Sequence, residues 1–251
     1  MAGHSKWANR VHRKTRQDAK RSNVFSKLSR EIIVAAREGG GSPDTNLRLR
    51  YAMDAARQAS MPNDNVENAI KRGTGDIEGV TYENVAYEGY GPGGVALMIA
   101  CLTDNAQRTV AELRNILKKR DANLGEPGSV AWVFEAKGVI TVPREAADEE
   151  ELFLAVIDAG AEDVLTEDEE FFEIRTGTRE FDGVVEAVNA LELPRDRAEI
   201  TMIPTSTTPV EDSEAGKLLS LLEELNDHDD VQKVYANFDI SDEALEAYDS
   251  E

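Results

Sequence analysis

The stretch VFEAKGVITVPREAADEEELFLAVIDAGAEDVLTEDEEFFEIRTGTREFDGVVEAVNALELPRDRAEITMIP, residues 133–204, decides the fold. Its apolar residues recur at every second position or at every third and fourth, the spacings of strands and helices. Together with the residues just before it, it predicts a strand, turn and strand over 130–142, a helix around 152–157, strands at 161–165 and 171–175, a helix around 184–191 and a strand at 198–203. From residue 133 on, this succession is β-α-β-β-α-β, the split βαβ plan of an antiparallel sheet with two helices on one face.

The segments on either side of this stretch need each other as partners. Before it, apolar residues predict two strands over 80–102 and a helix that ends near 120. After a linker rich in Ser, Thr and Pro, one leucine-rich helix at 218–225 and one strand at 231–240 remain. We therefore predict a discontinuous α+β domain, 77–132 plus 205–240, with 133–204 inserted as a second domain. Residues 241–251 are expected to form an acidic tail.

The first two strands are joined by the glycine-rich segment GYGPGG at 89–94. This segment matches the dinucleotide-binding pattern G-x-G-x-x-G by its letters. That pattern requires a helix directly after the glycines, whereas a strand-like segment follows here. We therefore predict a hairpin loop and no cofactor site.

The first 76 residues are expected to form a basic arm and a three-helix domain. Helical spacing covers 24–36, 47–59 and 66–70, and the helices end at glycines near 40, at Met61-Pro62 and at Gly73. The cap of the second helix is predicted within Ser42-Pro43-Asp44. The predicted fold class is α+β with three domains, an N-terminal helical bundle followed by two ferredoxin-like α+β domains, one inserted in the other.

The charge of the chain is unevenly distributed. The 28 Lys and Arg against 49 Asp and Glu give a net charge of -21. Residues 1–30 nevertheless hold nine basic side chains and one acidic one, whereas residues 73–251 hold 13 basic and 42 acidic ones. The net charge of the whole chain is unfavourable for binding to nucleic acid. It is, however, the sum of a cationic N-terminal arm and an acidic remainder.

The arm has the composition of a nucleic-acid-binding segment. Its cations have one acidic neighbour, and Trp7 and His12 lie among them. Cations attract phosphates and aromatic rings stack on bases. The candidate nucleic-acid-binding residues are Lys6, Trp7, Arg10, His12, Arg13, Lys14, Arg16, Lys20, Arg21, Lys27 and Arg30. The alternative is a solubilising tail that folds back on the acidic body. For the arginines of the second and third helices, a solvated face with local ion pairs is an equal alternative.

Catalytic and metal-binding patterns are missing from the sequence. Its three histidines and one cysteine do not stand at metal-ligand spacing, and no nucleophile or phosphate-loop motif occurs. We expect no enzyme, cofactor or metal. Cys101 lies in the apolar run 95–102, which predicts a buried, inert thiol. That run is the longest and is too short to span a membrane. We also expect a monomer.

Five ordered motifs resemble the YebC/PmpR family of transcriptional regulators, which includes the mitochondrial translational activator of cytochrome c oxidase. They are GHSKWAN at 3–9 with HRK at 12–14, MPNDNV at 61–66 with KRGTG at 71–75, YEGYGPGG at 87–94, TDN at 103–105 with RT at 108–109, and NLGEPGSVAW at 123–132. Val11 stands where the family has isoleucine. The chain begins at the first motif with no leader, which resembles bacterial members and implies a cytoplasmic location.

The resemblance implies a non-enzymatic protein whose arm and helical domain bind DNA. Other members of the family are translation factors that act at the ribosome and relieve stalling at proline-rich stretches. Both functions place cations on phosphate, so the sequence leaves DNA and ribosomal RNA open. Two further hypotheses are an acidic module that binds basic protein surfaces of the transcription or translation machinery, and a small-molecule sensor.

Overall fold

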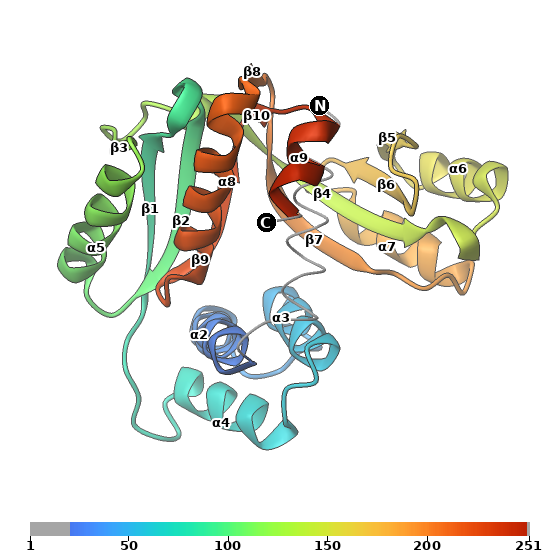
Figure 1. Ribbon diagram of the computed structural model, residues 1–251. Coiled ribbons are helices and arrows are strands. Elements are labelled where there is room, and N and C mark those ends of the chain that lie inside the picture. The colour runs from blue at the N-terminus through green and yellow to red at the C-terminus, as the bar shows by residue number, and fades with distance from the viewer. Residues whose placement is uncertain (1–20, 250–251) are drawn as a thin grey trace. The chain divides into compact units, whose positions relative to one another are not determined.

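The computed structural model describes residues 21–249 of the 251-residue chain (Figure 1). The chain divides into two compact units. One consists of Trp132–Thr207, and the other combines the described residues before Trp132 with those after Thr207. The predicted α+β class is confirmed, since a helical region is followed by sheets with helices. The division of the larger unit into a helical and a sheet domain stays a prediction.

The smaller unit is a four-stranded antiparallel sheet in the order β5-β6-β4-β7. Its elements are β4 (Phe134–Pro143), a 3-10 turn (Arg144–Ala146), α6 (Glu149–Asp158), β5 (Ala161–Leu165), β6 (Phe171–Thr176), α7 (Phe181–Ala190) and β7 (Arg197–Pro204). The helices α6 and α7 contact each other. This succession and strand order are those of the predicted β-α-β-β-α-β plan.

One prediction for this unit is wrong. Residues 130–142 do not form a strand, a turn and a strand, because β4 is one continuous strand preceded by a 3-10 turn at Ala131–Val133. Gly138, which suggests a turn in the sequence, lies inside β4. A Cβ atom at this position would lie 2.4 Å from the Phe181 ring, so the glycine is needed for close packing of α7 on the strand.

The larger unit contains the second four-stranded sheet, in the order β3-β1-β2-β9. Its strands are β1 (Glu83–Tyr90), β2 (Ala96–Thr103), β3 (Asn123–Leu124) and β9 (Val231–Ala236), and its helices are α5 (Ala106–Lys119), α8 (Asp212–Asp227) and α9 (Asp242–Asp249). A short parallel pair, β8 (Thr208–Pro209) with β10 (Phe238–Asp239), completes it. Strand β9 pairs with β2, so residues on either side of the smaller unit form one sheet.

The core of this sheet is built from leucine-rich helix faces. Leu113 and Leu117 of α5 pack with Leu218 and Leu222 of α8 against the apolar residues of β2. The end of the chain adds to this core, because α9 contacts α8 and Leu245 is buried. The expected acidic tail at 241–251 therefore needs correction, since residues 242–249 form a helix with an apolar anchor.

The glycine-rich segment is a hairpin connection, as predicted. Strands β1 and β2 pair antiparallel from Glu83 with Thr103 to Tyr90 with Ala96. A 3-10 turn at Pro92–Gly94 joins them, in which Gly93 and Gly94 have φ angles of 70° and 75°. Residues with a Cβ atom rarely adopt positive φ angles, so this turn requires glycine at both positions. Nearby, the Glu88 carboxylate accepts hydrogen bonds from the backbone N–H groups of Gly128, Val130 and Ala131.

Three helices precede the sheet in the larger unit: α2 (Arg21–Gly39), α3 (Leu47–Gln58) and α4 (Asn63–Thr74). The cap of α3 is Asn46 and not the predicted Ser42–Asp44 segment. The buried Asn46 amide accepts from the Leu49 N–H and donates to the carbonyl groups of Ala35 and Gly40. Asn46 is favoured as the cap because its side chain also connects α3 with the end of α2 through hydrogen bonds. No helix among residues 21–249 is long and apolar enough to cross a membrane.

Cys101 is buried in β2, as predicted. Burial and the nearby Asp230 charge raise the pKa of its thiol to about 12, against a weaker effect of Lys27. We expect native protein at about pH 8 to react with iodoacetamide at least a hundredfold more slowly than urea-unfolded protein, since the thiolate is the reactive form. Mass spectrometry of timed samples measures both rates. Equal rates would show that the thiol is accessible and would contradict the burial.

Candidate nucleic-acid interface

The predicted interface residues fall into two groups. Lys6, Trp7, Arg10, His12, Arg13, Lys14, Arg16 and Lys20 lie outside the described residues, as does the side chain of Arg21. Lys27 and Arg30 are described and lie three residues apart on one face of α2. Both are partly buried rather than free on the surface. The structure therefore shows the contacts of only the last two predicted residues, Lys27 and Arg30, and how they hold α2.

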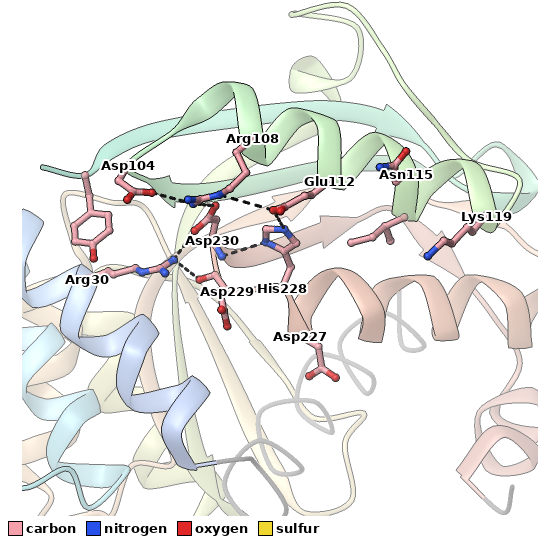
Figure 2. Close-up of a pocket in the computed structure, with 12 residues that line it drawn as sticks. Arg30, Asp104, Arg108, Glu112, Asn115, Lys119, Asp227, His228, Asp229 and Asp230 are labelled. Carbon is pink, nitrogen blue, oxygen red and sulfur yellow. Dashed lines mark hydrogen bonds and ion pairs between the residues drawn. The ribbon is translucent and has the colours of Figure 1, made fainter. Parts of the chain in front are cut away.

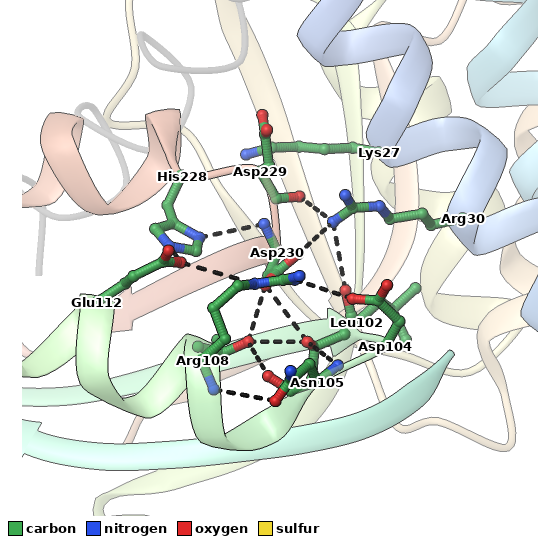
Figure 3. Close-up of polar contacts among 12 residues, drawn as sticks. Lys27, Arg30, Leu102, Asp104, Asn105, Arg108, Glu112, His228, Asp229 and Asp230 are labelled. Carbon is green, nitrogen blue, oxygen red and sulfur yellow. Dashed lines mark hydrogen bonds and ion pairs between the residues drawn. The ribbon is translucent and has the colours of Figure 1, made fainter. Parts of the chain in front are cut away.

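Lys27 and Arg30 hold α2 against the turn between α8 and β9 (Figure 3). The Lys27 Nζ group donates to the Asn226 carbonyl oxygen, and the Asn23 amide donates to that of Asp227 at 2.9 Å. The Arg30 guanidinium donates to the Asp229 carbonyl at 2.5 Å and to the Asp230 carboxylate at 2.8 Å. It also lies over the Tyr82 ring, 5.3 Å from its centroid. We call these contacts of α2 with residues 226–230 the α2 anchor.

Asp230 is the centre of the α2 anchor and is 2% exposed. Besides Arg30, its carboxylate accepts hydrogen bonds from Arg108 at 2.7 Å, from Thr109 at 2.7 Å and from Thr103 at 3.3 Å. Burial alone would raise its pKa, but the hydrogen bonds and the two guanidinium charges outweigh burial and hold the pKa below its usual value. A buried carboxylate is tolerated when it is paired in this way. Asp230 thus joins α2, α5 and β9 through one charge.

Lys27 is held less favourably. Burial lowers its pKa to about 8, although the charges of Asp227 and Asp229 act in the opposite direction. At neutral pH the amine still carries its charge, because the pKa stays above the pH. Its position against the Asn226 carbonyl leaves it poorly placed for a phosphate. The same holds for Arg30, whose donors are directed at Asp229 and Asp230.

An open cavity of about 650 Å³ borders the α2 anchor (Figure 2). Arg108 and Glu112 enter it from α5, His228 and Asp230 from the α8–β9 turn, and Arg30 from α2. Its lining holds five carboxylates and three cations: Asp104, Glu112, Asp227, Asp229 and Asp230 against Arg30, Arg108 and Lys119. An excess of carboxylates repels phosphate, so the lining of this cavity is unfavourable for a nucleic acid.

Three side chains at the cavity have the spacing of metal ligands. Donor atoms of Glu112, His228 and Asp230 lie within 4.8 Å of one another. However, the His228 Nδ1 atom accepts from the Asp230 N–H at 3.1 Å, so Nε2 carries the proton and donates to Glu112 at 3.0 Å. The Asp230 carboxylate is already bound by two guanidinium groups. The donor atoms of these side chains are already occupied by hydrogen bonds and ion pairs, and the positive charge of Arg108 beside them opposes the binding of a metal ion.

The remaining described cations of the helical region differ in their pairing. Arg48 pairs with Glu31 at 2.8 Å and with Glu38, and Arg57 pairs with Asp54 at 2.6 Å. These contacts fit the solvated-face interpretation. Lys71 and Arg72 lie in the last turn of α4 and form no ion pair with a residue of the described range. Arg37 and Arg50 also form no ion pair within this range, but they donate to backbone carbonyl groups. The exposed Lys71 and Arg72 are therefore the described cations of α2–α4 most available to a phosphate.

Four cations in α5 or directly after it have structural roles. Arg108 belongs to the network around Asp230, and Arg120 pairs with Glu224 of α8 at 3.1 Å. Lys118 and Lys119 lie in the last turn of α5, where they stabilise the negative end of the helix dipole. The position of Lys118 and Lys119 is therefore explained by the helix itself.

Asp230 could not be singled out from the sequence, because no periodic spacing connects it with Arg30, 200 residues earlier. One signal was available. Thr103, Arg108 and Thr109, three of its partners, all belong to the TDN and RT motif of the family resemblance. That motif therefore has a structural explanation, as the pocket for a buried carboxylate.

Known proteins resemble this chain along nearly its whole length. Residues 5–76 match the TACO1/YebC protein N-terminal domain, and residues 82–238 match the TACO1/YebC second and third domain. A protein of Natranaerobius thermophilus named probable transcriptional regulatory protein is 56% identical over 98% of this chain and 99% of its own. One of Persephonella marina with the same name is 54% identical over 98% and 99%. The crystal structure of the conserved hypothetical protein Aq1575 from Aquifex aeolicus is 47% identical, covers 90% of this chain and 93% of its own, and superposes with a TM-score of 0.82.

Proposed function

This chain belongs to the TACO1/YebC family, and from that premise we propose that it is a non-enzymatic regulator of gene expression that binds DNA through its basic N-terminal arm. The observation that carries the proposal is the concentration of cations in the first 30 residues, before and at the start of α2. Residues 1–30 hold nine basic side chains against one acidic one, in a chain of net charge -21. Relatives named probable transcriptional regulatory proteins support the regulatory role.

The α2 anchor narrows the proposed interface. Since Lys27 and Arg30 are bound to residues 226–230, we assign phosphate contact to the cations before them. The assigned residues are Lys6, Arg10, Arg13, Lys14, Arg16, Lys20 and Arg21, with Trp7 and His12 for stacking on bases. Lys71 and Arg72 of α4 are secondary candidates from the helical region.

The acidic remainder of the chain limits which part of the protein can contact a nucleic acid. The smaller unit alone holds 20 acidic and six basic side chains. Such a unit is repelled by phosphate, so binding is limited to the cationic end of the molecule. An acidic body also suppresses indiscriminate binding along nucleic acid, since every non-specific contact with DNA is electrostatic.

Ribosomal RNA is the alternative target. The family name covers TACO1 as well as YebC, and the resemblance includes translation factors that act at the ribosome. The same cations can bind RNA phosphates, and exposed RNA bases suit Trp7 even better than a stacked duplex does.

Crosslinking in cells followed by sequencing of the bound nucleic acid tests the proposal. We expect a limited set of promoter fragments to be enriched, and purified protein to prefer those duplexes over random competitor at about 0.15 M salt. A variant without the arm cations provides the background. Enrichment of ribosomal RNA with no preference for a particular duplex would overturn the DNA proposal and favour ribosomal RNA as the target. Enrichment of neither nucleic acid above background would overturn the proposal.

A further inference from the structure

Helix α6 of the smaller unit carries apolar side chains on two faces. Asp148 caps its first turn by accepting a hydrogen bond from the Glu151 N–H at 3.0 Å. Leu152 and Val156 are buried at 1% and 0% exposure, and these residues hold the helix to its unit. The fold therefore requires one apolar face of α6, and that face is already covered.

The second face exposes three large apolar residues to solvent. Phe153, Leu154 and Ile157 are 48%, 60% and 38% exposed. They stand at positions i, i+1 and i+4, so Ile157 adjoins both of the others on the helix surface. The described residues contain nine exposed large apolar side chains, and three of them lie on this ten-residue helix. Single exposed apolar side chains are ordinary, whereas a contiguous group is characteristic of an interaction site.

Carboxylates surround this apolar group. Glu149, Glu150 and Glu151 fill the first turn of α6, Asp158 ends the helix, and α6 contains no basic residue. Glu150 stands three and four residues before Phe153 and Leu154, and Asp158 stands four after Leu154, so both share the exposed face. Within residues 21–249, no cation forms an ion pair with any of these four carboxylates.

We propose that the exposed face of α6, formed by Phe153, Leu154 and Ile157 between Glu150 and Asp158, binds a basic amphipathic helix of another protein. A helix of this kind offers apolar residues at i, i+3, i+4 and i+7 and cations beside them. It would cover the apolar group and neutralise the carboxylates in one contact. None of these residues belongs to the proposed nucleic-acid interface, so the two proposals can be tested independently.

Charge argues against the other occupants of this face. A nucleic acid or an anionic membrane would bring its phosphates to the four carboxylates of α6. A second copy packed through the same face would place Glu150 and Asp158 of one chain near those of the other, and unpaired like charges oppose association. A basic protein helix is the occupant that both the apolar group and its charged ends favour.

Binding of a synthetic peptide to the full chain tests this proposal. The probe is a helical peptide of about 18 residues with leucines on one face and lysines and arginines on the other. A peptide of identical composition in scrambled order is the control probe. We expect isothermal titration calorimetry to show binding of the amphipathic peptide, and Phe153→Ser with Leu154→Ser to weaken it about tenfold or more. Glu150→Gln with Asp158→Asn should weaken it less and reduce its salt dependence.

Ile200→Ser is the matched control, because Ile200 is a large apolar residue of the same unit with 49% exposure. We expect this variant to bind the peptide like the unchanged chain, with circular dichroism confirming that all variants fold. Equal binding of the scrambled peptide, or equal weakening by the Ile200 control, would overturn the proposal. Sedimentation showing that the chain dimerises, and that the Phe153 and Leu154 changes abolish the dimer, would overturn it in favour of self-association.

A photocrosslinking residue at position 154 extends the test to cells. Leu154 is the most exposed residue of the apolar group, so its replacement should not disturb folding. We expect the crosslink to map to a basic amphipathic segment of another protein and to persist after nuclease treatment. Crosslinks that map to this chain itself or to nucleic acid would contradict the proposal.

Discussion

Replacing Lys6, Arg10, Arg13 and Lys14 by glutamine is expected to weaken binding to duplex DNA about a hundredfold or more at low salt. Each cation that neutralises a phosphate releases counterions, and this release supplies most of the affinity for nucleic acid. Loss of four such contacts should also reduce the slope of log affinity against log salt by about three to four. Fluorescence anisotropy with a labelled duplex over a range of salt concentrations measures both quantities.

A control with the same change of net charge separates the arm from the charge of the whole molecule. It replaces four cations of the described residues by glutamine: Arg57, Arg179, Arg195 and Lys217. At about 0.1 M salt we expect this control to lose less than about threefold in affinity and the arm variant to lose far more, because charge is screened beyond roughly 10 Å at this salt concentration. Equal losses in both variants would mean that net charge alone matters. Unchanged affinity in the arm variant would remove the arm from the interface.

The local part of the fold could be predicted from sequence, because periodicity reports which face of an element is buried. The order of elements over 133–204 followed from this signal, as did the burial of Cys101. The errors occurred where a distant residue decides the local structure. Gly138 stays within β4 because the Phe181 ring packs against it, and Asn46 caps α3 because its amide also reaches Ala35 and Gly40.

In the candidate site, too, partners that are distant in the sequence decide the role of a residue. A count of charges places Lys27 and Arg30 with the other cations of the first 30 residues. Their partners lie about 200 residues further along the chain, at Asn226, Asp229 and Asp230. Only the fold brings these segments together, so sequence could identify the cations but not their assignment to an internal contact. A composition argument thus locates a charged segment without locating its boundary.

Asp230→Asn is expected to lower the free energy of unfolding by about 3 kcal/mol at neutral pH, because it leaves two guanidinium groups without their buried counter-charge. Arg30 is only 15% exposed and depends most on Asp230, while Arg108 keeps Asp104 as a partner. Asparagine preserves the shape and, with its oxygen at the Oδ2 position, the hydrogen bonds from Thr103 and Thr109. Its amide nitrogen then replaces the oxygen that accepts from Arg30, so the loss reports the charge together with that hydrogen bond. Urea titration followed by circular dichroism measures the change.

The pH dependence of this loss has a defined sign. The pKa of Asp230 is lower in the folded chain than in the unfolded chain. Its charge therefore stabilises the fold fully above the unfolded pKa of about 4, and this contribution disappears as the pH falls through the folded pKa. The difference between Asp230→Asn and the unchanged chain should be constant between about pH 5 and pH 7 and should shrink below about pH 4.

Asp229→Asn provides the matched control, since the neighbouring side chain is exposed, forms its hydrogen bond to Arg30 through the backbone carbonyl, and acts on the α2 anchor otherwise only through its charge near Lys27. We expect this control to change the free energy of unfolding by less than about 0.5 kcal/mol. Equal effects at both positions would show that the network around Asp230 adds no stability.

The double variant Arg30→Gln with Asp230→Asn tests whether this charge fastens α2. If the two residues act through one contact, their effects will be non-additive by about 1 kcal/mol or more. Hydrogen exchange should then show faster exchange of α2 amides in either single variant, with smaller changes in α3, which does not contact the anchor. Because the arm leads directly into α2, such variants should also bind DNA with altered affinity while all the arm cations remain. Additive effects with uniform exchange would show that Asp230 stabilises the sheet alone and does not hold α2 in place.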